Sequence, residues 1–326
     1  MRLRSFFCLL TIGFAASTGT LAQAQTSPFQ PWITSLLPTR TTALVQSTDA
    51  LDKATAALCE RTSQEHLDTA RAAWRDAMLA WRTFEPLATG TDAKAAIDSG
   101  IADGPRIEAA VRQYTENPAL IGNGSADYGL PAIEYLFWGD ARAKAQQGRL
   151  VFKQRCAYAQ WLAADVAKAS AALSEGIQQA APATSASAYA DNLLTLIDTI
   201  ASKRLGNPAL PSYSDGAIAY DGWRSDFGKA VLNASLTTIE TLLFDPDGNA
   251  SALQQQATPA WLATGPQAIK TALGQIHTLL AAQPDDLTGA FRRNPKALRQ
   301  LREGVANLRT LVASMRQAIR DQSSHP

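Results

Sequence analysis

The sequence predicts an all-α protein made of two similar antiparallel helical bundles. Long stretches rich in Ala, Leu, Gln and Arg favour helix, and alternating runs of β-branched residues are nearly absent. One short apolar run with a single acidic residue also occurs twice. This repetition indicates an internal duplication at the scale of a domain, with a pocket expected where the two bundles meet.

The two matching runs are GLPAIEYLFWG, residues 129–139, and LTTIETLLFD, residues 236–245. Glu134 is the only charged residue of the first run, and Glu240 is the only one within 236–244 of the second. A carboxylate in such apolar surroundings is costly to bury unless it is paired, hydrogen-bonded or bound to a cation. Both acids are therefore candidate ligand-binding residues and candidate metal ligands. The alternative is two core helices whose glutamates are satisfied structurally.

The first 24 residues form a signal peptide. Arg2 and Arg4 precede an apolar segment, and Ala22-Gln23-Ala24 is a small-x-small cleavage site. The apolar segment is too short to span a membrane. We expect cleavage near Ala24 and export, which in a bacterium means the periplasm; the alternative is a buried N-terminal helix.

Helix signals follow the leader in order. A first long helix is expected over residues 28–60, with Pro38 kinking it or marking its true start. Thr62-Ser63-Gln64-Glu65 is a capping box that starts a second helix, where apolar residues recur at steps of three and four as far as Phe84. This pattern gives the second helix one apolar face.

The run that contains Glu134 has its own start and stop signals. Asp127 is expected to cap it, Pro131 falls in its first turn, and Gly139 ends it. Further helices are expected over 106–116, 150–179 and 188–205, after Gly222-Trp223-Arg224-Ser225, after Pro259 or Pro266, and after Asn294-Pro295.

The helices divide into two bundles, expected over residues 25–147 and 148–326. Each bundle then contains one helix with a lone acid. The break between them is expected near residues 140–150 or near 180–187, where Pro182 and several small residues indicate a hinge or loop.

Charge excludes two classes of partner. The chain has 30 basic and 29 acidic residues, and the signal peptide accounts for two of the arginines and no acid. Such a balance provides neither the basic stripe of a nucleic-acid-binding protein nor a polybasic membrane patch. No apolar run after the leader is long enough to span a membrane.

Two cysteines remain after the leader, Cys59 and Cys156. Export makes a disulfide between them possible, and we predict this bridge. Two free, buried thiols are the alternative. Two isolated cysteines are too few for a metal site made of cysteine alone.

Strong catalytic motifs are absent from the sequence. There is no Gly-rich phosphate loop and no HExxH, and the three histidines, His66, His277 and His325, are expected in packing or surface positions. Arg224, Ser225 and Arg204 are the residues best placed to complete a pocket around the lone acids, the arginines by pairing with them. The alternative for both arginines is an exposed position.

Three segments together resemble the imelysin-like family: GLPAIEYLFWG, the Trp-rich ARAAWRDAMLAW of residues 70–81, and GWRSDF of residues 222–227. The resemblance implies an exported protein of two helical bundles, with a pocket between them and an association with iron uptake. The founding member of the family is labelled a metallopeptidase, in part because of a GxHxxE motif. Here Gly129 and Glu134 are present, but Pro131 replaces the histidine. Proline cannot bind zinc, which argues against peptidase activity and leaves any enzymatic role open.

We therefore expect a periplasmic binding or accessory protein associated with iron uptake. Carboxylates and a few polar groups would hold iron, another divalent cation or a small anionic ligand. Components of iron uptake in the cell envelope are the expected partners. The alternatives are a helical interaction module with structural glutamates and a metallopeptidase.

Overall fold

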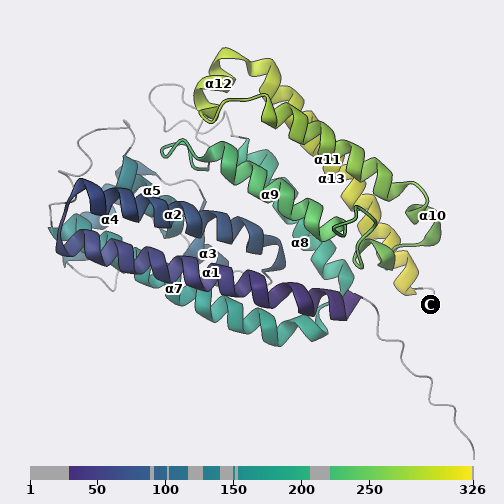
Figure 1. The fold of residues 1–326 in the computed structure, drawn as a ribbon, viewed down its shortest axis with the longest axis horizontal. Helices are drawn as coiled ribbons and strands as arrows, with labels where there is room; N and C mark the ends of the chain where they lie inside the picture. The colour runs from purple at the N-terminus through teal and green to yellow at the C-terminus, as the bar shows by residue number, and fades with distance from the viewer. Residues whose placement is uncertain are drawn as a thin grey trace, which may run out of the picture.

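The computed structural model describes residues 29–88, 92–100, 103–116, 128–139, 150, 153–205 and 221–324. Within these ranges there is no β-strand, and the extended pairings are two isolated bridges, Asp98 with Gly129 and Phe244 with Ala250. The all-α prediction is confirmed (Figure 1).

The first bundle contains three long helices that lie side by side (Figure 1). A short helix, α5, packs against two of them, α2 and α7. Two further short helices, α3 and α4, also contact α5 and α7. The bounds are α1 Phe29–Glu60, α2 Gln64–Phe84, η1 Glu85–Leu87, α3 Asp92–Ile97, α4 Gly104–Glu116, α5 Gly129–Trp138 and α7 Lys153–Ala180.

The second bundle is built on α8, α9, α11 and α13. Its longest helix, α13, packs against both α8 and α11. Helix α9 lies between α2 of the first bundle and α11 of the second. It therefore forms much of the contact between the bundles. The bounds are η3 Ala181–Ala183, α8 Ala186–Thr199, η4 Ile200–Arg204, α9 Gly228–Leu243, η5 Gln254–Gln256, α10 Pro259–Leu262, α11 Gly265–Ala281, α12 Leu287–Arg293 and α13 Pro295–Ser324.

The bundles do not divide at residue 147, because α7 packs along α1 in the first bundle. A disulfide joins Cys59 at the end of α1 to Cys156 in α7, and the two Cα atoms lie 5.5 Å apart. The change of bundle comes at η3, between α7 and α8, within the alternative break of residues 180–187. The packing of α7 along α1 therefore places α7 in the first bundle, although the glycine-containing stretch before it had suggested a break there.

Local signals in the sequence place several helix ends. Ser63 is the N-cap of α2, and its side chain accepts a hydrogen bond from the backbone N–H of His66. Asn294 accepts from the backbone N–H of Ala297 at the start of α13. Pro38 lies inside α1, which continues through it.

No helix in the described ranges has the length and apolar character that a membrane span requires. The expected signal peptide of residues 1–24 and the expected cap Asp127 lie outside these ranges.

Candidate functional site

Helix α5, the run that contains Glu134, is buried along its whole length. The Trp74 indole donates a hydrogen bond of 2.8 Å to the carbonyl of Leu130, near the start of the helix. Arg71 donates to the carbonyl of Phe137, near its end, at 2.7 Å from Nη2. Side chains of α2 therefore satisfy backbone groups of α5 at both ends and hold it in position.

Gly129 starts this helix with a left-handed φ of 71°. A Cβ atom there would lie 2.4 Å from the carbonyl oxygen of Ile97. Gly129 also forms the isolated bridge with Asp98. Only glycine permits both this φ and this close backbone approach, so the glycine sets where α5 begins.

The carboxylate of Glu134 meets the turn that precedes α9. Its Oε1 accepts a hydrogen bond of 2.9 Å from the backbone N–H of Ser225 and one of 2.7 Å from the Ser225 hydroxyl. Glu134 is 3% exposed and Ser225 is 5% exposed. Within the part of the chain that the structure describes, Oε2 of Glu134 has no hydrogen-bond partner.

Burial raises the pKa of Glu134 to about 7. The nearby charge of Arg224 and the two hydrogen bonds from Ser225 act in the opposite direction, but they do not cancel the cost of burial. The charge of Asp221 adds to the rise. Near neutral pH the carboxyl group is thus close to the midpoint between its protonated and ionised forms.

Arg224 is buried, and its charge acts on Glu134. Its guanidinium lies 5.2 Å from the centre of the Tyr135 ring and 4.5 Å from that of Trp223. Arg155 approaches the Tyr135 ring as well, at 5.4 Å. Two guanidinium groups therefore share one aromatic ring next to Glu134, and cation–π attraction offsets part of their desolvation.

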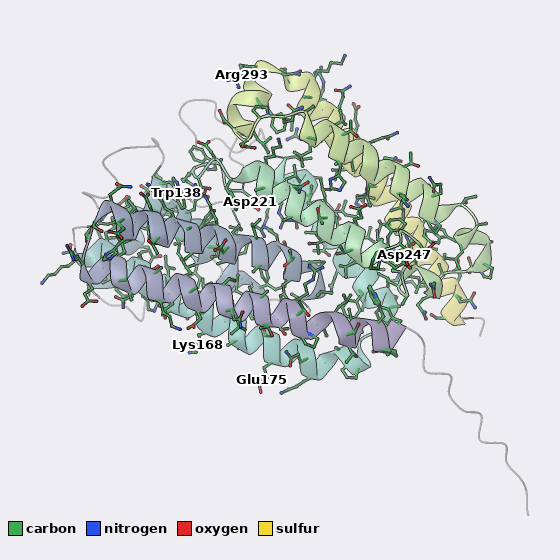
Figure 2. The ribbon with its side chains drawn as sticks, in the orientation of Figure 1. Trp138, Lys168, Glu175, Asp221, Asp247 and Arg293 are labelled. Atoms are coloured by element: carbon green, nitrogen blue, oxygen red, sulfur yellow. A yellow bond between two sulfur atoms is a disulfide. The ribbon has the colours of Figure 1, made fainter. Side chains whose placement is uncertain are left out.

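A buried group of charged residues lies next to Glu134 and centres on Arg82. Arg82 Nη1 lies 3.1 Å from Glu85 and 2.5 Å from Asp98, and its Nη2 lies 2.7 Å from Asp221. In Figure 2, the label Asp221 marks the segment before α9, and the label Asp247 marks the segment after it. The contact between Arg82 and Asp221 therefore joins α2 to the segment that leads into α9.

Arg204 completes the same group rather than facing Glu134. Its Nε donates to Asp221 at 3.1 Å, its Nη1 to the Ser235 hydroxyl at 2.8 Å, and its Nη2 to Glu85. The π-helical turn η4 positions this side chain, which is 2% exposed as a residue. All three nitrogens of Arg204 are thus engaged inside the protein, so the structure favours a structural role for it.

The pKa values of two acids of this group, Asp98 and Glu85, shift in the opposite direction to that of Glu134. Burial alone raises the pKa of Asp98, but the charge and hydrogen bond of Arg82 outweigh it and hold this pKa below its ordinary value. The pKa of Glu85 is lowered similarly, because Arg204 and Arg82 outweigh the effect of burial. The carboxylates of Asp98 and Glu85 therefore stay ionised in the fold, whereas Glu134 can gain or lose a proton near neutral pH.

Glu240 is not brought to this site. Its side chain is 46% exposed, and Oε2 lies 3.5 Å from Nε2 of His277 on α11. Twelve helical steps separate Glu240 from Gly228 at the start of α9, which is about 18 Å along the axis. Glu134 lies against Ser225 and Glu240 lies beside His277, so the structure gives the two candidate acids different surroundings. The two acids have similar sequence neighbours and both lie on helices. Every residue of α5 is buried, whereas α9 buries only part of its surface and leaves Glu240 outside the buried part.

The described residues do not form a metal centre. Among them, no three His, Cys, Asp or Glu side chains are grouped so that they could hold an ion. Pro131 stands where the motif histidine of a zinc site would be, and Ser225 donors surround Oε1 of Glu134. A resident catalytic zinc therefore does not fit the residues described around Glu134.

Sequence reasoning missed Arg82, Glu85, Asp98 and Asp221. Arg82 and Glu85 lie at the end of α2, whereas Asp98 and Asp221 lie in two other segments, and no motif relates the three segments. The available signal was weak: Arg82 and Glu85 are charged residues at the end of a helix whose apolar face was recognised.

The family model described as Imelysin, Peptidase M75, matches residues 38–315. The chain belongs to the imelysin family. No curated protein matches this imelysin-family chain. The match spans both bundles and includes every residue of the site described above.

Two solved structures share the imelysin fold with this protein. An imelysin-like protein from Psychrobacter arcticum 273-4 is 20% identical, with a TM-score of 0.68; the alignment covers 89% of this chain and 93% of that one. A putative iron-regulated protein A precursor from Parabacteroides distasonis ATCC 8503 is 13% identical, with a TM-score of 0.71, and the alignment covers 91% and 97%. At these identities the likeness establishes the fold of this imelysin-family protein.

Proposed function

We propose that this imelysin-family protein is exported to the periplasm and acts there as a binding or accessory protein in iron uptake, with Glu134 at its binding site. The leader of residues 1–24 supports export. The name of the Parabacteroides relative, a precursor of an iron-regulated protein, supports both export and the association with iron. The protein acts without peptidase chemistry, because Pro131 replaces the motif histidine.

The state of Glu134 carries this proposal. One oxygen of its carboxylate is held by Ser225, and the other has no hydrogen-bond partner among the described residues. Burial has raised its pKa to about 7, so the acid is partly protonated when the site is empty. A cation, or a cationic group of a larger ligand such as an iron complex, would favour the ionised form and displace the proton. Binding should therefore release protons at neutral pH.

One observation favours a second candidate, a helical interaction module in which Glu134 is structural. The two hydrogen bonds from Ser225 join α5 of the first bundle to the segment before α9. A carboxylate that holds two bundles together can be retained for that reason alone.

The two candidates differ in the response of Glu134→Gln, which keeps the size of the side chain and removes its charge. The mature protein is titrated calorimetrically with ferrous iron under anaerobic conditions, with zinc and with ferric citrate, in buffers of different ionisation enthalpy. We expect saturable binding to at least one probe, release of part of a proton, and at least a tenfold loss in Glu134→Gln.

Glu240→Gln is the matched control, because it removes a half-exposed acid of the other bundle, and it should bind as the wild type does. If Glu134→Gln binds as well as the wild type and differs only in melting temperature, the acid is structural. A casein assay with and without a chelator tests peptidase activity, and no chelator-sensitive cleavage is expected.

A further inference from the structure

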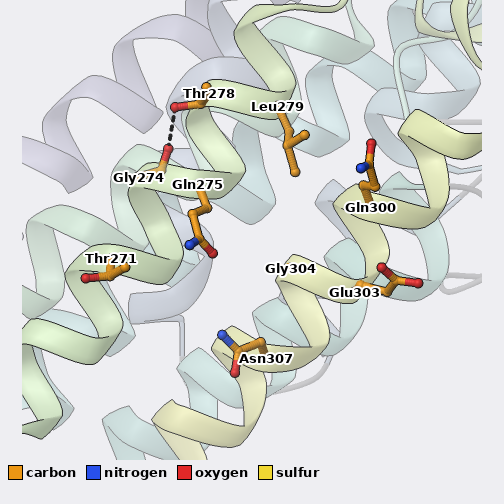
Figure 3. A pocket seen from close by; sticks show the side chains of 9 residues that line it. All are labelled: Thr271, Gly274, Gln275, Thr278, Leu279, Gln300, Glu303, Gly304 and Asn307. Carbon is orange, nitrogen blue, oxygen red and sulfur yellow. Dashed lines mark hydrogen bonds between the residues drawn. The ribbon is translucent and has the colours of Figure 1, made fainter.

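A second feature of the molecule is a groove between α11 and α13 (Figure 3), and Glu134 is not among its lining residues. It consists of two adjoining cavities of about 820 and 530 Å³ that share Thr271, Gln275 and Asn307. Cavities of this size are typical of ligand sites. From Gln267 to Leu279 the groove follows α11 for twelve residues, or about 18 Å.

Uncharged hydrogen-bonding side chains line both walls of the groove. They are Gln267, Thr271, Gln275 and Thr278 on α11, and Gln300 and Asn307 on α13. Glu303 is the one charged residue among the described lining residues. Gln275, Gln300 and Asn307 have no hydrogen-bond partner in the described protein, so each amide has both donors and acceptors free for a ligand.

Three arginines of α13 pair with acids outside the groove. Arg309 pairs with Asp198, at 2.5 Å, and Arg316 and Arg320 pair with Asp191, at 2.8 and 3.0 Å. Both aspartates belong to α8, on the other side of α13. These three cations of α13 therefore face α8, whereas Gln300 and Asn307 of the same helix line the groove beside α11.

The spacing of the polar groups on α11 fits an extended peptide. Gln267, Thr271 and Gln275 follow one another at steps of four residues, or about 6 Å along the helix axis. An extended chain repeats its main-chain N–H and C=O groups on one side every two residues, or about 6.6 Å. The polar side chains of α11 and the main-chain groups of an extended peptide therefore stay aligned over two or three repeats. A primary amide can donate to a carbonyl and accept from an N–H at the same time.

Two glycines shape the groove. A Cβ on Gly304 would lie 2.9 Å from the Ile276 side chain, so glycine there permits the close packing of α13 on α11. At Gly274, by contrast, a Cβ would meet nothing within 4 Å. Packing within this chain does not require glycine at position 274, where it weakens the helix. Because Gly274 has no side chain, the main chain of another segment can approach α11 closely at this position.

We propose that this groove binds an extended peptide segment of low charge from a partner protein. The amides on its walls hydrogen-bond the peptide main chain over five or six residues, and Glu303 selects a basic side chain near the middle. A helical ligand would keep its main-chain groups bonded internally and leave these amides unmatched. A glycan is disfavoured because the described lining residues include no aromatic ring on which a sugar could stack.

The test uses three pools of fluorescein-labelled, N-acetylated and C-amidated hexapeptides with Val, Thr and Ser randomised around a fixed central Lys, Leu or Glu. Binding to the mature protein is followed by fluorescence anisotropy. We expect saturable binding in the order Lys, Leu, Glu, and loss of binding when the Lys pool is N-methylated along its backbone. Gln275→Ala combined with Asn307→Ala should weaken binding about tenfold, and Glu303→Gln should remove the preference for Lys over Leu.

Matched glycine variants control for folding. Gly274→Ala and Gly176→Ala both add a methyl group to a helix where nothing lies within 4 Å, but Gly176 is on α7, outside the groove. Both should raise the melting temperature, and only Gly274→Ala should weaken peptide binding. The proposal is overturned if no pool binds below 1 mM, if the N-methylated pool binds as well, or if the double variant binds as the wild type does. Binding of a helical peptide or an oligosaccharide without binding of the extended pools would also overturn it.

Discussion

The Glu134 carboxylate and Ser225, 91 positions apart in the chain, are joined by two hydrogen bonds to a single oxygen atom. One bond comes from the backbone of Ser225 and the other from its hydroxyl, so the contact depends on the turn as well as on the side chain. It joins α5, buried in the first bundle, to the segment that leads into α9. The proposed binding site is therefore also a link between the bundles, and its charge state affects both ligand affinity and folding stability.

Glu134 should make the protein less stable as pH rises toward neutrality. The folded protein holds this proton with a pKa of about 7, against an ordinary value of 4.5. The contribution of this group is therefore fully present below pH 4.5 and is lost as pH rises through 7, by up to about 3 kcal/mol. In Glu134→Gln the free energy of unfolding, measured with urea between pH 4.5 and 8, should fall less than in the wild type. Glu240→Gln should follow the wild type, and equal slopes for all three proteins would contradict the assignment.

The charged group around Arg82 should be sensitive to loss of one partner. Arg82→Met leaves the carboxylates of Glu85, Asp98 and Asp221 buried with one fewer cation, and we expect a loss of about 3–5 kcal/mol in the free energy of unfolding. Arg309→Met is the control, because it breaks an ion pair with Asp198 in which both side chains are half exposed. That change should cost less than about 1 kcal/mol. Similar losses in the two variants would show that burial does not govern the effect.

The same group should produce acid sensitivity. The pKa values of Glu85 and Asp98 are held below their ordinary values, because Arg204 and Arg82 outweigh the effect of burial. The stability from these acids is therefore present above their ordinary pKa, near 4, and is lost as pH falls below it. The melting temperature of the wild type, plotted against pH, should therefore pass through a maximum. It should fall on the acid side as Glu85 and Asp98 are protonated, and on the neutral side as Glu134 ionises. A melting temperature that rises steadily from pH 5 down to pH 3 would contradict this prediction.

The disulfide between Cys59 and Cys156 closes a loop across 97 positions. Cys59→Ala combined with Cys156→Ala should lower the free energy of unfolding by about 4 kcal/mol in the chain-entropy account. Guanidinium denaturation of the oxidised protein and of the double variant measures this difference. Thiol titration of the unfolded, unreduced wild type should find neither of these cysteines reactive, and finding both reactive would rule out the bridge.

Gly129 should tolerate no side chain. Gly129→Ala places a Cβ 2.4 Å from the Ile97 carbonyl oxygen at a left-handed φ of 71°, so the backbone must move. The left-handed conformation alone costs about 1–2 kcal/mol in an L-residue, and the clash adds to it. Gly176→Ala, in an open part of α7, should instead stabilise by up to about 1 kcal/mol. Opposite shifts in melting temperature are expected, and a neutral Gly129→Ala would show that α5 starts elsewhere.

The sequence by itself determined the class of fold, the main helices and several of their ends. These features depend on local chemistry, as Ser63 shows: a serine before an amphipathic helix caps it whatever surrounds the helix. The apolar run around Glu134 likewise marked α5 as a buried helix, because only the interior can accommodate ten such residues in succession. The place of Arg224 and Ser225 just before the second run makes them candidates to complete a pocket.

Only the tertiary structure decided which charges meet. Glu134 and Glu240 have similar sequence surroundings, yet one is buried against Ser225 and the other is half exposed beside His277. Arg82 and Asp221 are 139 positions apart, and no local pattern relates them. Helix α7 likewise joined the first bundle through contacts along α1 rather than through any signal in its own residues. Local sequence sets helix formation because its hydrogen bonds join near neighbours, whereas the pairing of buried charges depends on how whole helices pack.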